Sequence, residues 1–162
     1  MKKIFAQLLG DDYGAMVEAA KRLAESNSPS PKLRELLRRE RREPTRHAIL
    51  YALSWKRDLR AWPIFVRVLS DRSESALVRG QAAEGLAYNF HRKRKGSAGF
   101  ESAFTALVAA SRDASAEVLY YVAFALGASR DARALPVLRK MTRDRAVAAE
   151  ASDAIMQLQT RP

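Results

Sequence analysis

An internal repeat is the feature that most constrains what this chain can fold into. Residues 58–65, Asp-Leu-Arg-Ala-Trp-Pro-Ile-Phe, match residues 131–138, Asp-Ala-Arg-Ala-Leu-Pro-Val-Leu, position by position at an offset of 73 residues. The same offset relates Asp71 to Asp144, and a degenerate copy at 102–107 leads to Asp113. Similarity at a fixed period predicts a stack of related supersecondary units that bury a continuous core between neighbours.

The second half of each unit has the spacing of a helix. A leucine or isoleucine recurs along the chain at successive spacings of 30, 33, 40 and 29 residues. These anchor residues are Leu23, Leu53, Leu86, Leu126 and Ile155. Small or apolar residues lie three and four positions before each anchor, which is the helical period and not the period of two expected of strands. Small side chains let neighbouring helices approach closely while the anchor fills the groove between them.

The repeat predicts an all-α fold with ten helices. We expect them near 2–9, 12–26, 31–42, 44–56, 60–70, 75–90, 98–111, 115–128, 132–143 and 146–158. Pro44, Pro63 and Pro136 then fall in first turns, where a missing amide donor costs little. The length suits one domain over 1–162. Within it we expect an N-terminal capping repeat at 1–43, central repeats at 44–145 and a C-terminal cap at 146–162.

The motif Asp-x-Arg-Ala-x-Pro, followed by an Asp-bounded turn, Val-Arg and an Ala-rich stretch ending Ala-Leu-Gly, resembles HEAT-like repeats of the phycobilisome-lyase type. The best matches are residues 58–69, 78–86, 118–127 and 131–138, and the resemblance covers roughly 44–156. It implies a right-handed α-solenoid of about five HEAT-like helix pairs. It also implies that Arg79 pairs with a turn aspartate, either Asp71 or Asp113. The family implies scaffolding in general but no single task.

Composition narrows the partners and the compartment. The chain carries 29 Lys and Arg against 18 Asp and Glu, a formal net charge of +11, so acidic partners are attracted at long range. The absence of cysteine excludes disulfides and thiolate chemistry, and it fits a reducing, cytoplasmic location. The apolar run 118–128 is too short to cross a bilayer. The apolar start at 4–9 is too short for a secretion signal, so we expect no membrane partner.

A row of aromatic side chains is predicted on the concave side of the solenoid. Positions two and six residues before each anchor, and two after it, point outward from the second helices. Six of these positions form the aromatic row: His47, Tyr51, Trp55, Tyr88, Tyr120 and Phe124. Exposed rings in a row are typical of interface centres. The alternative is that helix 115–128 is apolar all round, with Tyr120 or Phe124 packed under a neighbour.

Two basic segments are further candidates for binding. The insertion 88–99 carries four consecutive cations, Arg92, Lys93, Arg94 and Lys95. A cationic loop of this kind could grip phosphates or an acidic protein patch, or it could be a solvated surface loop. A second stretch follows one helix and its turn, with Arg34, Arg38, Arg39, Arg41, Arg42 and Arg46. Some of these side chains should be solvated cations at the helix end.

Known enzyme signatures are missing from the sequence. There is no glycine-rich phosphate loop, and residues 96–99, Gly-Ser-Ala-Gly, lack the glycine that a nucleophile elbow places two residues before its serine. The two histidines, His47 and His91, cannot form a metal pair on one helix. The iron-binding His-Glu dipeptide of HEAT-like hydroxylases is absent, and nothing marks the tetrapyrrole pocket of a bilin lyase. HEAT-like DNA glycosylases share a basic, aromatic-lined concavity, for which Tyr51, Trp55 and Asp153 are the candidates, but their motifs are not recognisable here.

The sequence therefore predicts a non-catalytic protein-protein interaction module of the adaptor, chaperone-like or immunity type. Its aromatic concave face and basic surface would hold an acidic macromolecular partner, with no cofactor and no metal. The alternative is nucleic-acid binding through phosphate contacts from the basic segments, with a relation to the HEAT-like DNA glycosylases.

Overall fold

The computed structural model describes residues 1–26, 30–56 and 58–159, and within these ranges it contains helices and no strands. The α-helices are α1 (Lys2–Leu8), α2 (Tyr13–Glu25), α3 (Ser30–Arg39), α4 (Glu43–Trp55), α5 (Trp62–Ser70), α6 (Ala76–Asn89), α7 (Ala98–Ala110), α8 (Ala116–Ala128), α9 (Leu135–Met141) and α10 (Ala148–Gln159). Three short 3₁₀ turns, η1 (Leu59–Ala61), η2 (Phe90–Arg92) and η3 (Ala132–Ala134), lie between them. The ten predicted helices are all present, with bounds that differ by up to three residues. Residues 160–162 of the expected C-terminal cap lie outside the described ranges.

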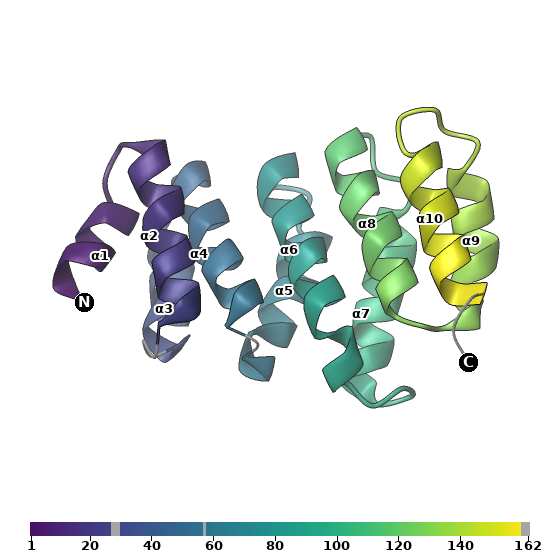
Figure 1. The fold of residues 1–162 in the computed structure, drawn as a ribbon, viewed down its shortest axis with the longest axis horizontal. Helices are drawn as coiled ribbons and strands as arrows, with labels where there is room; N and C mark the ends of the chain where they lie inside the picture. The colour runs from purple at the N-terminus through teal and green to yellow at the C-terminus, as the bar shows by residue number, and fades with distance from the viewer. Residues whose placement is uncertain (27–29, 57, 160–162) are drawn as a thin grey trace.

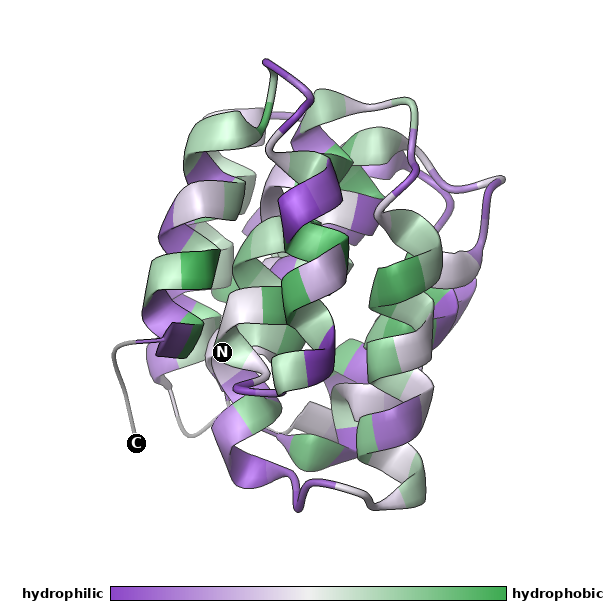
Figure 2. Cartoon of the chain, turned by 90° about the vertical axis from the view of Figure 1, so that its right-hand side faces the viewer, coloured by the Kyte–Doolittle hydropathy of each residue, from purple (hydrophilic) through white to green (hydrophobic). Residues whose placement is uncertain are grey.

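The helices form an α-solenoid of five pairs. The second helices α2, α4, α6, α8 and α10 stand side by side in one layer, and α3, α5, α7 and α9 lie behind them (Figure 1). Each second helix contacts the next along the row. The first and last helices, α1 and α10, lie toward opposite ends of the row (Figure 1). Viewed along the row, hydrophilic residues mark the connecting loops, while each helix carries hydrophobic and hydrophilic residues together (Figure 2).

The repeated Asp-x-Arg-Ala-x-Pro motif encodes one local structure twice. Asp58 and Asp131 each accept a hydrogen bond from the backbone N–H two residues later, which begins a 3₁₀ turn. Proline then occupies the second position of α5 and of α9, where no intrahelical donor is needed. The predicted helices at 60–70 and 132–143 therefore begin as 3₁₀ turns and not as α-helix. The side chains of Asp12, Ser75 and Ser97 cap α2, α6 and α7 in the usual way.

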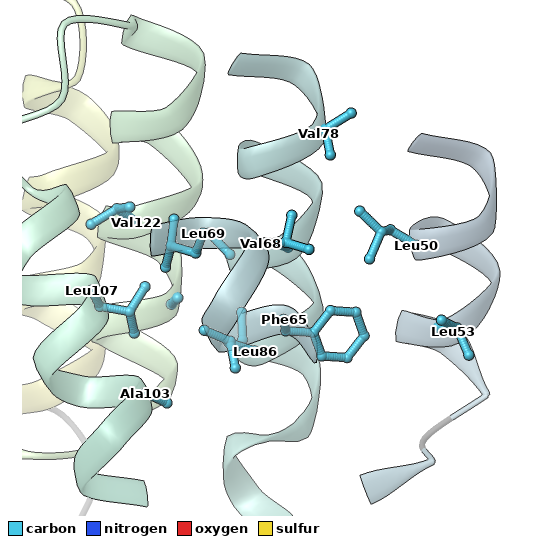
Figure 3. Close-up of a cluster of buried hydrophobic side chains, with 14 of the residues drawn as sticks. Leu50, Leu53, Phe65, Val68, Leu69, Val78, Leu86, Ala103, Leu107 and Val122 are labelled. Atoms are coloured by element: carbon cyan, nitrogen blue, oxygen red, sulfur yellow. The ribbon is translucent and has the colours of Figure 1, made fainter. Parts of the chain in front are cut away.

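The core lies between the two layers and runs the length of the solenoid. Anchors Leu23, Leu53, Leu86 and Leu126 are fully buried, whereas Ile155 on the last helix is only partly covered. Figure 3 shows how α5 fills the space between α4 and α7, with Phe65, Val68 and Leu69 directed among side chains of the neighbouring helices. Gly85 permits this packing, because a Cβ there would lie 2.7 Å from a ring carbon of Phe65. The small residue before the anchor thus sets how closely α5 and α6 approach.

Buried arginines brace the helix pairs against the loops. Arg79 donates hydrogen bonds to the carboxylate of Asp113 and, at 3.1 Å, to the backbone carbonyl of Glu74. The predicted pairing of Arg79 is thereby confirmed for Asp113, while Asp71 accepts hydrogen bonds from Ser73. Burial raises the pKa of Asp113, but the hydrogen bonds from Arg79 and from the Ser115 backbone, together with the charges of Arg79 and Arg72, outweigh it, and the net shift is downward.

Arg46 forms a second brace of the same kind. It lies seven residues before its anchor, as Arg79 does, and it is 9% exposed. Its guanidinium donates to the carboxylate of Glu74 and, at 2.9 Å in each case, to the carbonyls of Leu37 and Glu40. The expectation that some of the 34–46 arginines are solvated cations at the helix end is confirmed for Arg38 and Arg39, which are exposed in the last turn of α3. Arg46 is not one of them, because it is buried in the brace.

Candidate binding surface

Four rings of the predicted aromatic row, Tyr51, Trp55, Tyr88 and Phe124, are successive neighbours across three second helices. The ring centres of Tyr51 and Trp55 on α4 are 6.2 Å apart, and Trp55 lies 4.7 Å from Tyr88 on α6. Tyr88 in turn meets Phe124 on α8 at 5.8 Å, edge to face. Trp55 is 45% exposed and Tyr120 47%, so the alternative of a buried Tyr120 is wrong. Phe124 is partly buried against the core, as that alternative proposed.

His47 on α4 is another of the six predicted positions, and it brings the aromatic row next to α2. The imidazole Nδ1 lies 3.4 Å from the hydroxyl of Tyr13. Burial lowers the pKa of His47, and a hydrogen bond with Gln81 and the charge of Glu43 only partly oppose it. Tyr13 was not predicted, although it lies one turn before Val17 and so continues the same helix face. Extending the spacing rule by four residues would have found it.

Glu84 lies at the centre of the aromatic row. Its carboxylate accepts hydrogen bonds from Gln81 Nε2 at 2.5 Å and from the hydroxyl of Tyr88 at 3.2 Å. Burial raises the pKa of Tyr88 to about 12, with Glu84 contributing. Burial also raises the pKa values of Tyr51 and Tyr121, and the charge of Glu84 adds to both shifts. One carboxylate therefore acts on several tyrosines of this surface.

Two adjoining hollows make the surface concave. The first, about 320 Å³, is lined by Tyr13, Val17, Ala20, His47, Ala48, Tyr51, Gln81, Glu84 and Tyr121, which come from α2, α4, α6 and α8. The second, about 420 Å³, lies between α2 and α4 and is lined by Lys21, Ala24, Glu25, Tyr51 and Trp55. Tyr51 belongs to both hollows. Because residues of four successive helices line one hollow, the row of second helices curves inward here.

Tyr121 is a second residue of this surface that the sequence did not reveal. The spacing rule makes Gly80, six residues before Leu86, an outward position, but it is buried under the ring of Tyr121. A Cβ on Gly80 would lie 3.0 Å from Cδ2 of that ring, so glycine allows the tyrosine to lie against α6. The prediction of Gly80 as an outward position is therefore wrong, because the space above a glycine is open to a neighbouring side chain.

The second helices carry more acidic than basic residues although the chain is strongly basic. The five second helices contain four Lys and Arg, which are Lys21, Arg22, Arg46 and Arg79. They contain seven acidic residues, which are Glu18, Glu25, Glu43, Glu84, Glu117, Glu150 and Asp153. Arg46 and Arg79 are buried in the braces, and Lys21 Nζ lies 3.8 Å from the carboxylate of Glu18. The basic surplus therefore lies on the first helices and in the loops.

The basic segment 92–95 lies between α6 and α7, at the lower ends of these helices in Figure 1. Lys93 Nζ lies 5.3 Å from the ring centre of Trp62, at the start of α5, and Lys95 Nζ lies 3.6 Å from the carboxylate of Asp131. Arg92 is part of η2, and Arg94 is exposed. Lys93 and Lys95 are thus engaged with residues outside the aromatic row.

The arginines of 34–46 are also largely engaged within the chain. Arg34 pairs with Asp58, and Arg39 Nη2 lies 2.8 Å from Glu35. Arg42 pairs with Asp11 and Glu40, each at 3.1 Å. Within residues 1–26, 30–56 and 58–159 there is no group of three potential metal ligands. Nor is any helix in the described part long and apolar enough to cross a membrane.

Comparison with known families decides what this architecture is. A family model of HEAT repeats matches residues 63–159, which run from the start of α5 to the end of α10. The chain belongs to the HEAT-repeat family. None of the curated proteins compared with it matches. HEAT repeats build extended concave surfaces that bind other proteins, and they are typically non-catalytic. The matched HEAT repeats include Tyr88, Tyr120 and Phe124 of the aromatic row, and the brace at Arg79.

Proposed function

We propose that this HEAT-repeat chain is a protein-protein interaction module, of the adaptor, chaperone-like or immunity type, that holds its partner on the concave aromatic surface. The proposed contact residues are the six of the aromatic row: His47, Tyr51, Trp55, Tyr88, Tyr120 and Phe124. The resemblance of the sequence motif to lyase-type repeats does not add a lyase activity to the proposed function. The binding role is proposed as non-catalytic, because the surface offers rings and hydrogen-bonding groups but no recognisable catalytic arrangement.

The observation that carries the proposal is the exposure of large rings inside a hollow. Trp55 and Tyr120 are each nearly half exposed; the Trp55 ring contacts Tyr88, and the Tyr120 ring lies 5.2 Å from that of Tyr121. Rings that are held in place lose little conformational freedom when a partner covers them. Such rings supply much of the binding free energy at interface centres.

The two sides of the molecule suit partners of opposite charge. Among the described residues only four Lys and Arg lie on the second helices, so an acidic partner suits the outer surface. The acidic concave side does not suit it. Nucleic-acid binding remains the alternative for the outer basic segments, but Lys93 and Lys95 already contact Trp62 and Asp131. No feature of the concave side favours a phosphate backbone.

A pull-down with the tagged full chain tests the proposal. The variant Trp55→Ala with Tyr120→Ala should keep its helical circular dichroism and lose partner binding by about tenfold or more, as interface anchors do. The matched control, Arg67→Ala with Arg139→Ala, removes two exposed long side chains from α5 and α9 and should capture the partner as the wild type does. Capture of the same partner at wild-type strength by the aromatic double variant would refute the proposal.

A further inference from the structure

We infer that the centre of the concave surface binds a lysine- or arginine-rich segment of a protein partner, with Glu84 as its charged contact and the rings of Tyr51, Trp55 and Tyr88 beside it. The inference rests on the proposed binding role of this surface and specifies the partner's chemistry there. Its starting point is the separation of charge, because a chain with a net charge of +11 has an acidic concave side.

Glu84 is held in place but has no cationic partner. Gln81 and Tyr88 each donate one hydrogen bond to its carboxylate. An ionised carboxylate offers about four lone-pair positions, so it can accept further hydrogen bonds from a ligand. Within residues 1–26, 30–56 and 58–159, no Lys or Arg forms a salt bridge with Glu84. Arg46 and Arg79, the basic residues of α4 and α6, are turned into the braces.

The surrounding rings suit a cation as well. Tyr51, Trp55 and Tyr88 form neighbouring pairs at 6.2 and 4.7 Å, and their planes are tilted by 44° and 42°. Ammonium and guanidinium groups bind over the faces of such rings, and Trp55 is 45% exposed. The hollows of about 320 and 420 Å³ that meet at Tyr51 have room for long side chains. Arginine and lysine both combine an apolar stem with a charged head, which matches rings beside a carboxylate.

The other charged groups near the two hollows also favour a positively charged ligand. Glu18, Glu25 and Glu84 all act on Tyr51 with negative charge. Burial lowers the pKa of His47, so the imidazole contributes no positive charge at neutral pH. Lys21 at the rim is close to Glu18. An acidic peptide or a nucleic acid would place its charge against these carboxylates, and an uncharged segment would leave Glu84 without a counter-charge.

Calorimetric titration of the full chain with unlabelled oligolysine, oligoarginine and oligoglutamate tests the inference. At about 0.15 M salt the Debye length is about 8 Å, so the distant cations of the outer surface are screened while the groove carboxylates act locally. We expect the two basic peptides to bind. Glu84→Gln should weaken the binding of both peptides about tenfold or more, because one member of an interface charge pair is lost. Glu35→Gln on α3 removes the same charge from the other layer and should have no effect.

The outcomes separate this inference from the proposed function. Basic peptides that fail to bind, or that bind Glu84→Gln as tightly as the wild type, overturn the inference. If the pull-down still depends on Trp55 and Tyr120 in that case, the binding role survives with a partner of other chemistry. Circular dichroism and thermal melting of Glu84→Gln should match the wild type, and Trp55→Ala should independently weaken the basic peptides without removing any charge.

Discussion

The two sides of this solenoid differ in charge and in what their charged residues do. On the outer helices and loops, cations are numerous and many pair with carboxylates nearby, as Arg34 does with Asp58 and Arg39 with Glu35. On the concave side, cations are few and Glu84 is held only by neutral donors. The overall charge of +11 therefore describes the outside of the molecule and misrepresents the surface that we propose for binding.

The braces explain how the two sides come to differ. Arg46 and Arg79 belong to the second helices, but both guanidinium groups turn to carboxylates and carbonyls of the loops. Their charge is neutralised there, and the concave side is left to rings and carboxylates. In the next unit the same position, seven residues before the anchor, is Leu119, and no arginine brace is possible. A hollow of about 240 Å³ lies beside Leu119, between α7 and α9.

The largest effect should come from removing a brace. Arg79→Ala leaves Asp113 buried without its counter-charge, and we expect a loss of about 3–5 kcal/mol in the free energy of unfolding. Arg139→Ala, on the exposed side of α9, should change it by less than about 0.5 kcal/mol. Urea denaturation followed by circular dichroism measures both. A small effect of Arg79→Ala would mean that the braces do not stabilise the solenoid.

A smaller effect on stability should appear when low pH protonates Asp113 of the same brace. The pKa of Asp113 is lower in the folded protein than its ordinary value of 3.8, so its contribution to stability is complete above pH 3.8. That contribution is lost as the pH falls through the lowered folded value. We expect Asp113→Asn to be less stable than the wild type at pH 7, with a difference that narrows below pH 3.8. Denaturation midpoints at a series of pH values measure the difference, and a gap that stays constant would contradict the prediction.

The sequence predicted the helices and the aromatic row because both depend on local spacing. The anchors identify the buried face of each second helix, and the opposite face follows from the helical period. The charge of the concave side was not predicted, because the arginine count does not tell where each long side chain turns. Arg46 was grouped with the surface arginines for this reason. Tyr121 was missed because its position depends on the space above Gly80, on another helix.

The outer surface offers a further test of the contrast between the two sides. We expect short duplex DNA to bind weakly at low salt and to dissociate as salt rises from about 0.05 to 0.2 M, as non-specific phosphate contacts do. Arg92→Gln with Arg94→Gln should weaken this complex and reduce the dependence of log K on log salt by about two or less. Glu84→Gln should leave it unchanged. Mobility shifts that respond to Glu84→Gln but not to the loop variant would place nucleic acid on the concave side.

The smallest effect should appear in the titration of the tyrosines. Burial and the charge of Glu84 raise the pKa of Tyr88 to about 12. Glu84 also contributes to the raised pKa values of Tyr51 and Tyr121. Replacing this carboxylate with a neutral amide removes the repulsion toward phenolate, so Glu84→Gln should shift the ultraviolet tyrosine titration to lower pH.

Glu35→Gln carries the same change of charge on α3 and should leave the tyrosine titration where it is. Because burial is the larger cause of the shift for Tyr51, Tyr88 and Tyr121, the titration of Glu84→Gln should still lie above the ordinary value of 10.0 for these residues. A titration that is identical in Glu84→Gln and wild type would mean that the carboxylate does not act on the rings. The concave side would then lack the central negative charge that a basic partner requires.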